Sequence, residues 1–228
     1  MFIGHYSASF VAAAHPRAPR LGTLFIAAQL VDIAFFCFVL IGVEHMRMVP
    51  GMTAMNPMDL YDMPLTHSLL GASCWALAFG GIVWLALRSR PAGMIAALVV
   101  LSHWVLDLIV HRPDLTLAGG PPPLGLGLWN HRAIEMPLEL ALAFGALAFF
   151  AAKTRPVSNQ GRWSLALLAL ALAGFQAINW LMPQPARVVD PVPASAPLLA
   201  LLAYAVLTAL AWWTATTRRL STSSRPAA

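Results

Sequence analysis

The sequence predicts an all-α integral membrane protein, a single bundle of about six transmembrane helices. Hydrophobic residues make up 59% of the 228 residues and charged residues 10%, with a mean hydropathy of +0.72. A soluble domain carries about 25% charged residues. Six apolar runs are also long enough to cross a bilayer, which requires about 20 residues in a helix. Together these observations predict a multi-pass membrane protein.

The expected elements follow one another without a soluble domain between them. Residues 1–16 form an apolar segment that is too short to span, and residues 221–228 form a polar tail. Residues 1–220 are therefore expected to form one transmembrane domain. The six spans are predicted near residues 21–43, 66–88, 92–111, 133–152, 163–182 and 197–216.

Each predicted span has a boundary residue of a suitable kind. Arginines anchor helix ends at the membrane interface, and Thr or Asp side chains cap the starts of helices. Prolines are tolerated in the first turn or in a connection, and an acidic residue in the first turn complements the helix dipole. In chain order, these boundary residues are Arg20, Asp62 or Thr66, Pro91, Glu135, Pro156 and Pro197.

The apolar N-terminal segment has two interpretations. If residues 2–14 form a re-entrant half-helix, His5 would lie ~15 Å inside the membrane. Asp32 lies ~18 Å from the same face, counted from Arg20, so the two side chains could meet near the midplane. Alternatively, the segment is an interfacial amphipathic helix with His5 among the headgroups.

Positive charges predict the orientation of the bundle. With both termini in the cytoplasm, ten basic residues face the cytoplasm and four face the opposite side, as the positive-inside rule requires. The cytoplasmic set is Arg17, Arg20, Arg88, Arg90, Lys153, Arg155, Arg162, Arg218, Arg219 and Arg225; the other set is Arg47, Arg112, Arg132 and Arg187.

Composition also excludes some functions. The basic residues form no stripe with interleaved aromatic residues, so nucleic acid is not an expected partner. The two cysteines, Cys37 and Cys74, lie in apolar runs, and a disulfide framework is not expected. Membrane lipids are the expected surroundings, and the oligomeric state stays open.

Three polar residues of the third predicted span share one helix face. His103, Asp107 and His111 are spaced by four residues, which places them within a sector of about 80°. Ionisable groups are costly in a bilayer and usually face an interior site. A His and an Asp at this spacing can bind one divalent metal ion, so this face is a candidate metal site.

Geometry limits the ligands that one ion can use. His103 and His111 are ~12 Å apart along the helix axis, so one ion can bind His103 with Asp107 or Asp107 with His111. The other histidine would bind a second ion or transfer a proton. The partners expected from elsewhere are Asp32, His5 and His67. Nitrogen and oxygen ligands suit zinc, expected first, or manganese or iron.

The remaining polar residues receive weaker assignments. Glu135 and Glu139 share a face of the fourth predicted span; Glu135 suits the helix dipole, and Glu139 is the candidate general base or additional ligand. Glu44 and His45 are expected at the membrane interface. The spans near 163–182 and 197–216 carry few polar residues and are expected to serve as scaffold.

Several segments resemble one bacterial family of integral membrane proteins, described as membrane-bound metal-dependent hydrolases. The resemblance covers about residues 4–150, and its most specific part combines a THS element with HWxLDxxxHRPD. The matching segments are GHYS at residues 4–7, LFIAAQLVD at 24–32, THSLL at 66–70, SHWVLDLIVHRPD at 102–114 and GLGLWN at 125–130.

This resemblance implies a metal-dependent hydrolase in the bacterial inner membrane. It implies metal ligation by His5, Asp32, His67, His103 and Asp107, and it includes His111 in the site. Asp114 also matches, but Pro113 precedes it and leaves its role open.

The expected reaction is attack of metal-activated water on an ester or phosphoester. His111 or Glu139 would move the proton, and a site within the bilayer suits an amphiphilic, lipid-like substrate. A proton- or metal-coupled transporter could use the same residues, since Asp and His chains also form proton relays. A third hypothesis is a non-catalytic assembly protein in which these residues only hold helices together.

Overall fold

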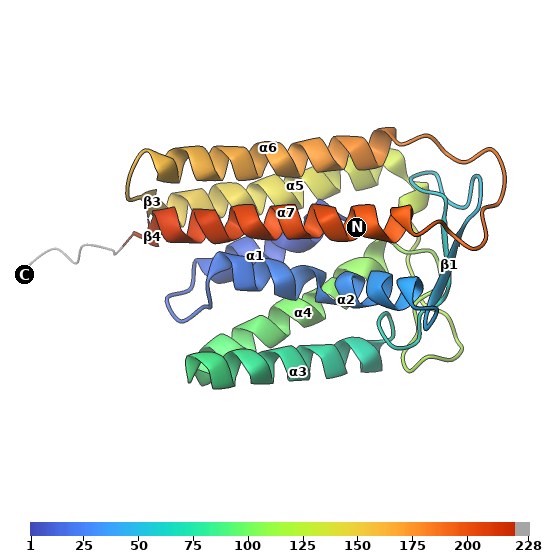
Figure 1. Cartoon of the computed structure of the whole chain (residues 1–228), viewed down its shortest axis with the longest axis horizontal. Helices are drawn as coiled ribbons and strands as arrows, with labels where there is room; N and C mark the ends of the chain where they lie inside the picture. Colours follow the sequence, from blue (N-terminus) through green and yellow to red (C-terminus); the bar gives the residue numbers. More distant parts are fainter. Residues whose placement is uncertain (222–228) are drawn as a thin grey trace, which may run out of the picture.

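Six long apolar helices form a multi-pass membrane bundle, as the sequence predicts (Figure 1). The computed structural model describes residues 1–221, and the rest of the predicted polar tail lies outside the described residues. The long helices are α2 (Leu21–Leu40), α3 (Leu69–Leu87), α4 (Arg90–Val110), α5 (Arg132–Lys153), α6 (Gln160–Leu181) and α7 (Ser195–Thr217). Each end lies within three residues of the predicted boundary.

The start of α3 differs from the prediction because another residue caps it. Ser68, not Thr66 or Asp62, is the N-cap residue, and its Oγ accepts a hydrogen bond of 2.9 Å from the Gly71 amide. The Thr66 and His67 side chains therefore precede the helix, where they are free to contact other elements.

The N-terminal segment is re-entrant, and the interfacial interpretation is wrong. A 3-10 turn, η1 (Ile3–His5), leads into α1 (Tyr6–Ala13), which packs against α2 and α5. His5, Tyr6 and Phe10 are almost fully buried. The Tyr6 ring stacks on Phe25 of α2 with ring centroids 4.2 Å apart. Because α1 lies inside the bundle, it brings His5 to the protein interior.

Helices α3 and α4 form a tight antiparallel pair with two glycines at its closest approach. A Cβ on Gly80 would lie 2.8 Å from the Gly93 carbonyl oxygen, and a Cβ on Gly93 would lie 2.6 Å from the Gly80 carbonyl oxygen. Small residues allow such backbone approach in membrane helices. This pairing fixes α4, the helix that carries His103 and Asp107.

The two ends of the bundle carry different short elements. A hairpin of β1 (His45–Met48) and β2 (Met58–Asp62) covers one end, together with the 3-10 turn η2 (Leu128–Asn130). At the opposite end β3 (Thr154–Pro156) pairs with β4 (Arg218–Leu220), where the chain approaches its C-terminus (Figure 1).

Candidate metal centre

The carboxylate of Asp107 on α4 lies among four imidazole rings. Its Oδ2 is 2.9 Å from Nε2 of His103 and 3.8 Å from Nε2 of His67. Its Oδ1 is 3.2 Å from Nε2 of His5 and 3.5 Å from Nε2 of His111. The Met1 amine lies 3.3 Å from the same Oδ1. Helical spacing explains the contacts with His103 and His111, because both are one turn from Asp107.

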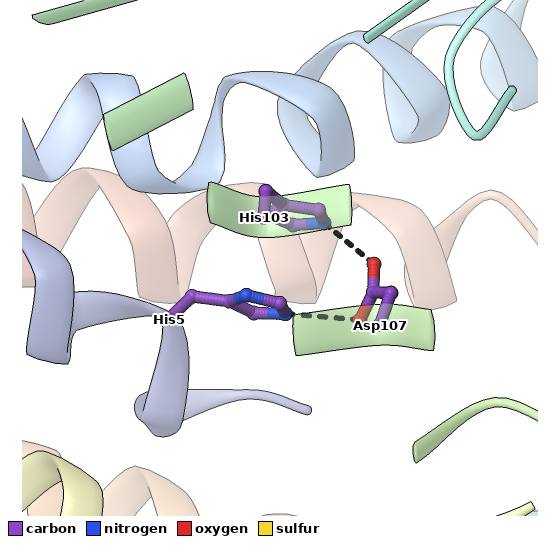
Figure 2. A group of neighbouring side chains, drawn as sticks. All are labelled: His5, His103 and Asp107. Atoms are coloured by element: carbon purple, nitrogen blue, oxygen red, sulfur yellow. Dashed lines mark ion pairs between the residues drawn. The ribbon is translucent and has the colours of Figure 1, made fainter. Parts of the chain in front are cut away.

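Figure 2 shows how the N-terminal turn meets α4 at this point. The His5 and His103 rings stack, with centroids 3.8 Å apart and an interplanar angle of 6°. Both rings direct a nitrogen toward the Asp107 carboxylate, which lies one helical turn beyond His103. His5, His103 and Asp107 are all buried, and one donor atom from each lies within 4.8 Å of the others.

Asp32 of α2 completes a second group of donors. Its Oδ1 lies 3.3 Å from Nε2 of His67 and 3.5 Å from Nε2 of His103. His103 and Asp32 therefore lie at similar depth, as the helix arithmetic predicts. The structure brings together all five residues predicted as ligands, His5, Asp32, His67, His103 and Asp107, and adds His111 beside them.

Three of the histidine rings are held by a hydrogen bond at Nδ1, which leaves Nε2 directed toward Asp107. Nδ1 of His103 lies 2.7 Å from the Ala28 carbonyl oxygen, which can only accept, so Nδ1 carries the proton. Nδ1 of His111 lies 2.8 Å from Oδ1 of Asp114, which gives Asp114 a defined role. Metal-binding histidines usually have such a partner on the second nitrogen, because it fixes tautomer and ring orientation.

A chain of two hydrogen bonds, which the sequence did not reveal, joins Nδ1 of His67 to Glu44 through Thr66. Its Nδ1 lies 2.8 Å from Oγ1 of Thr66, and this hydroxyl donates to Oε2 of Glu44 at 2.6 Å. The other Glu44 oxygen accepts from the amides of Leu65 and Thr66. Glu44 follows the end of α2 and is fully buried, where it supports His67 through Thr66. The THS element was the available signal for Thr66, but Glu44 is distant in sequence.

Thr66→Val should weaken metal binding by roughly 10–100-fold, because it removes the hydroxyl that orients His67. Valine keeps the shape but removes a donor to the buried Glu44 carboxylate, so a loss of stability of about 1.5–3 kcal/mol should accompany the loss of affinity. Metal affinity is measured by competition with a chromophoric chelator. Thr216→Val is the control, since Thr216 is exposed on α7 and its hydroxyl contacts only the Trp213 carbonyl. Wild-type affinity in Thr66→Val would show that Thr66 does not support the site.

Asp32 is held by a helix that was expected to be scaffold. The Tyr204 hydroxyl of α7 donates to Oδ2 of Asp32 at 2.9 Å, which leaves Oδ1 facing the histidines. Tyr204 is buried, and no local motif marks it. On α6, Gln176 donates to Glu139. Helix α7 therefore contributes a contact to the site, so its description as plain scaffold is wrong, whereas this α6 contact supports Glu139.

The donor set fits a divalent metal ion. Ligand bonds of 2.0–2.2 Å place neighbouring donors on one ion about 2.8–3.6 Å apart. The four contacts of Asp32 and Asp107 with His67 and His103 range from 2.9 to 3.8 Å. Among the described residues, both His5 nitrogens, Nε2 of His103 and Oδ2 of Asp107 are buried without a hydrogen-bond partner. Buried polar atoms are rarely left unsatisfied, so these atoms are suited to bind an ion.

His103 and His111 contact different oxygens of Asp107. Among the described residues, neither group of donors within reach of one ion contains both histidines, as the sequence predicts.

Glu139 lies away from this group and holds the N-terminal segment. Its Oε1 accepts hydrogen bonds from the amides of Phe2 and Gly4, and its Oε2 accepts from Gln176 at 2.8 Å. These contacts indicate a positioning role, and none supports the predicted role as general base. Glu135 is also buried, but both of its oxygens lack a partner among the described residues.

Comparisons with known proteins leave the function to be argued from this geometry. No family model, curated protein or solved structure matches the chain.

Proposed function

We propose that the protein is an integral membrane hydrolase that depends on a divalent metal ion. The observation that carries this proposal is the convergence of four imidazole Nε2 atoms on the Asp107 carboxylate inside a membrane bundle. Two groups of donors could hold an ion, His5 with His103 and Asp107, and Asp32 with His67 and His103, so His103 would be the ligand common to both. The residues that carry the resemblance to the membrane-bound metal-dependent hydrolases are the same residues.

Zinc is the proposed ion, and manganese and iron suit the same ligands. When bound, such an ion lowers the pKa of water to about 7 and polarises an ester or phosphoryl oxygen. His111 is the proposed proton-transfer residue, because it lines the cavity beside Asp107 and its Nδ1 is paired with Asp114.

In the proposed reaction, the water oxygen forms a bond to the carbonyl carbon or phosphorus, and the bond to the leaving oxygen breaks. His111 accepts a proton from the water and then donates one to the leaving oxygen. Asp114 would keep the His111 ring oriented through both transfers.

The test measures metal and turnover in the same sample. Protein purified in detergent should contain near-stoichiometric metal by elemental mass spectrometry. Removal of the metal with a chelator should abolish hydrolysis of 4-nitrophenyl esters or phosphoesters, and reloading should restore it. Folded protein that binds no metal after reloading would overturn the proposal and favour a cluster that only joins helices.

A transporter is the second candidate, favoured by the buried carboxylates on α5. Glu135 and Glu139 line a small cavity of about 50 Å³ together with the N-terminal residues Met1 and Phe2. Chains of buried acids and histidines carry protons across membranes. Metal- or proton-dependent flux in proteoliposomes, without any turnover of ester probes, would favour this candidate over the hydrolase.

We further propose a location in the bacterial inner membrane with both ends of the chain on the cytoplasmic side. The positive-inside rule supports this orientation. The end of the bundle that carries β3 and β4 would then be cytoplasmic, and the β1–β2 hairpin and the metal centre would lie toward the opposite face.

A further inference from the structure

A cavity of about 310 Å³ leads away from the candidate metal centre. Asp32, His67, Asp107 and His111 line one part of it. The rest of its wall comes from Met1, Phe2 and Trp129 and from α2, α6, α7 and the β1–β2 hairpin, which are far apart in the sequence. The cavity is therefore continuous with the proposed reaction centre.

Apart from the centre, the wall of this cavity is almost entirely apolar. The apolar wall includes Phe35 and Phe36 of α2, Phe175 of α6, and three alanines and one leucine of α7. Among the described residues that line it, Asn179 and Tyr204 are the only uncharged polar side chains, and the Tyr204 hydroxyl is already bonded to Asp32. Such a wall offers few partners for a sugar or a peptide backbone.

The cavity also extends to the outside of the bundle between α6 and α7. Ile178 and Leu199 line it and are 59% and 62% exposed. Both residues belong to helices that are long and apolar enough to span the membrane. Ile178 lies about one turn before the end of α6 and Leu199 about one turn after the start of α7, so this opening lies at the hairpin end of two apolar helices, where the chain of a membrane lipid can enter.

We infer that the substrate is an amphiphile with one long hydrocarbon chain, an inference that rests on the proposed function. The chain lies among α2, α6 and α7, and the ester or phosphoester group lies beside Asp32 and Asp107. The volume supports one chain, because it is at the lower end of the roughly 300–1,000 Å³ found for ligand sites. A chain that fills the cavity restores dispersion contacts that the apolar lining otherwise lacks, so binding should increase with chain length until the cavity is full.

The test compares short and long chains on two kinds of bond. The probes are 4-nitrophenyl acetate and dodecanoate, and the methyl and dodecyl diesters of 4-nitrophenyl phosphate, each with protein in lipid nanodiscs. Ala200→Phe fills the cavity from α7. Ala205→Phe is the matched control, because Ala205 is exposed on the same helix and does not line the cavity.

Wild type should have at least a tenfold higher kcat/KM for the long probe than for the short probe of the preferred bond type. Ala200→Phe should lower this ratio at least tenfold at unchanged metal content, whereas Ala205→Phe should keep it. The ester and phosphoester pairs distinguish a carboxylic ester from a phosphate lipid. Turnover without chain-length preference, or a wild-type ratio in Ala200→Phe, would overturn the inference and leave the hydrolase intact.

A binding measurement separates this inference from the proposed function. Dodecyl phosphonate cannot be hydrolysed, and its binding can be followed through tryptophan fluorescence, since Trp129 lines the cavity. Binding that is at least tenfold weaker in Ala200→Phe, with no turnover of any probe, would support the amphiphile site and overturn hydrolysis. Equal binding of dodecyl and methyl phosphonate would overturn the amphiphile site.

Discussion

Asp107→Asn should leave a folded bundle that no longer retains metal and no longer turns over ester probes. Asp107 is the one side chain in contact with all four histidines of the centre, and both of its carboxylate oxygens take part. Asparagine keeps the volume but removes the charge and replaces one oxygen with an amide nitrogen. Loss of a residue that hydrogen-bonds to a metal ligand lowers metal affinity about 10–100-fold. Loss of the ligand itself should therefore lower metal affinity at least about 100-fold.

The measurements for this variant are metal content, by elemental mass spectrometry, and kcat/KM with 4-nitrophenyl probes. Asp62→Asn is the matched control, because the Asp62 side chain is 44% exposed and pairs with His45 on the β1–β2 hairpin. The control should keep both metal and turnover. Wild-type metal content in Asp107→Asn would exclude Asp107 as a ligand and would refute the proposed centre.

Glu139→Ala should give the second large effect, a loss of stability of about 3 kcal/mol or more. The Glu139 carboxylate accepts from two backbone amides of the N-terminal segment and from Gln176, all in a buried environment. Hydrogen bonds to a charged group contribute about 1.5–3 kcal/mol each, and the amides would be left unpaired. Because His5 follows directly, its contact with Asp107 should also weaken, and metal affinity should fall.

Glu135→Ala provides the control one helical turn away. Glu135 is buried as well, but its oxygens have no partner among the described residues, so its removal should leave stability unchanged or increase it. Unfolding in detergent with increasing denaturant gives the free energies. Similar losses in the two variants would show that the hydrogen bonds of Glu139 do not anchor the N-terminal segment.

The sequence predicted what depends on local pattern. Hydropathy located all six spans, and helical spacing placed His103, Asp107 and His111 on one face. Depth arithmetic brought Asp32 to the level of His103, which the contact of 3.5 Å confirms. A count of residues along a helix is sufficient for such statements, because the rise per residue is constant.

The parts that the sequence did not predict depend on contacts between distant segments. Tyr204 bonds to Asp32 across 172 residues, and Glu139 bonds to the amide of Phe2 across 137 residues. Glu44 reaches His67 only because the chain between them folds back and Ser68, not Thr66, caps α3. No periodicity records these pairings, since they follow from how the helices are arranged around each other.

The re-entrant N-terminal segment has a consequence for biogenesis. It is synthesised first, but Glu139 and Gln176, which hold it, follow 135 to 173 residues later. At 5–20 residues per second, this gap lasts roughly 10–30 s. During that time the amides of Ile3 and Gly4, which precede His5, have no partner on α5 or α6. The proposed centre is therefore complete only after most of the chain has been translated.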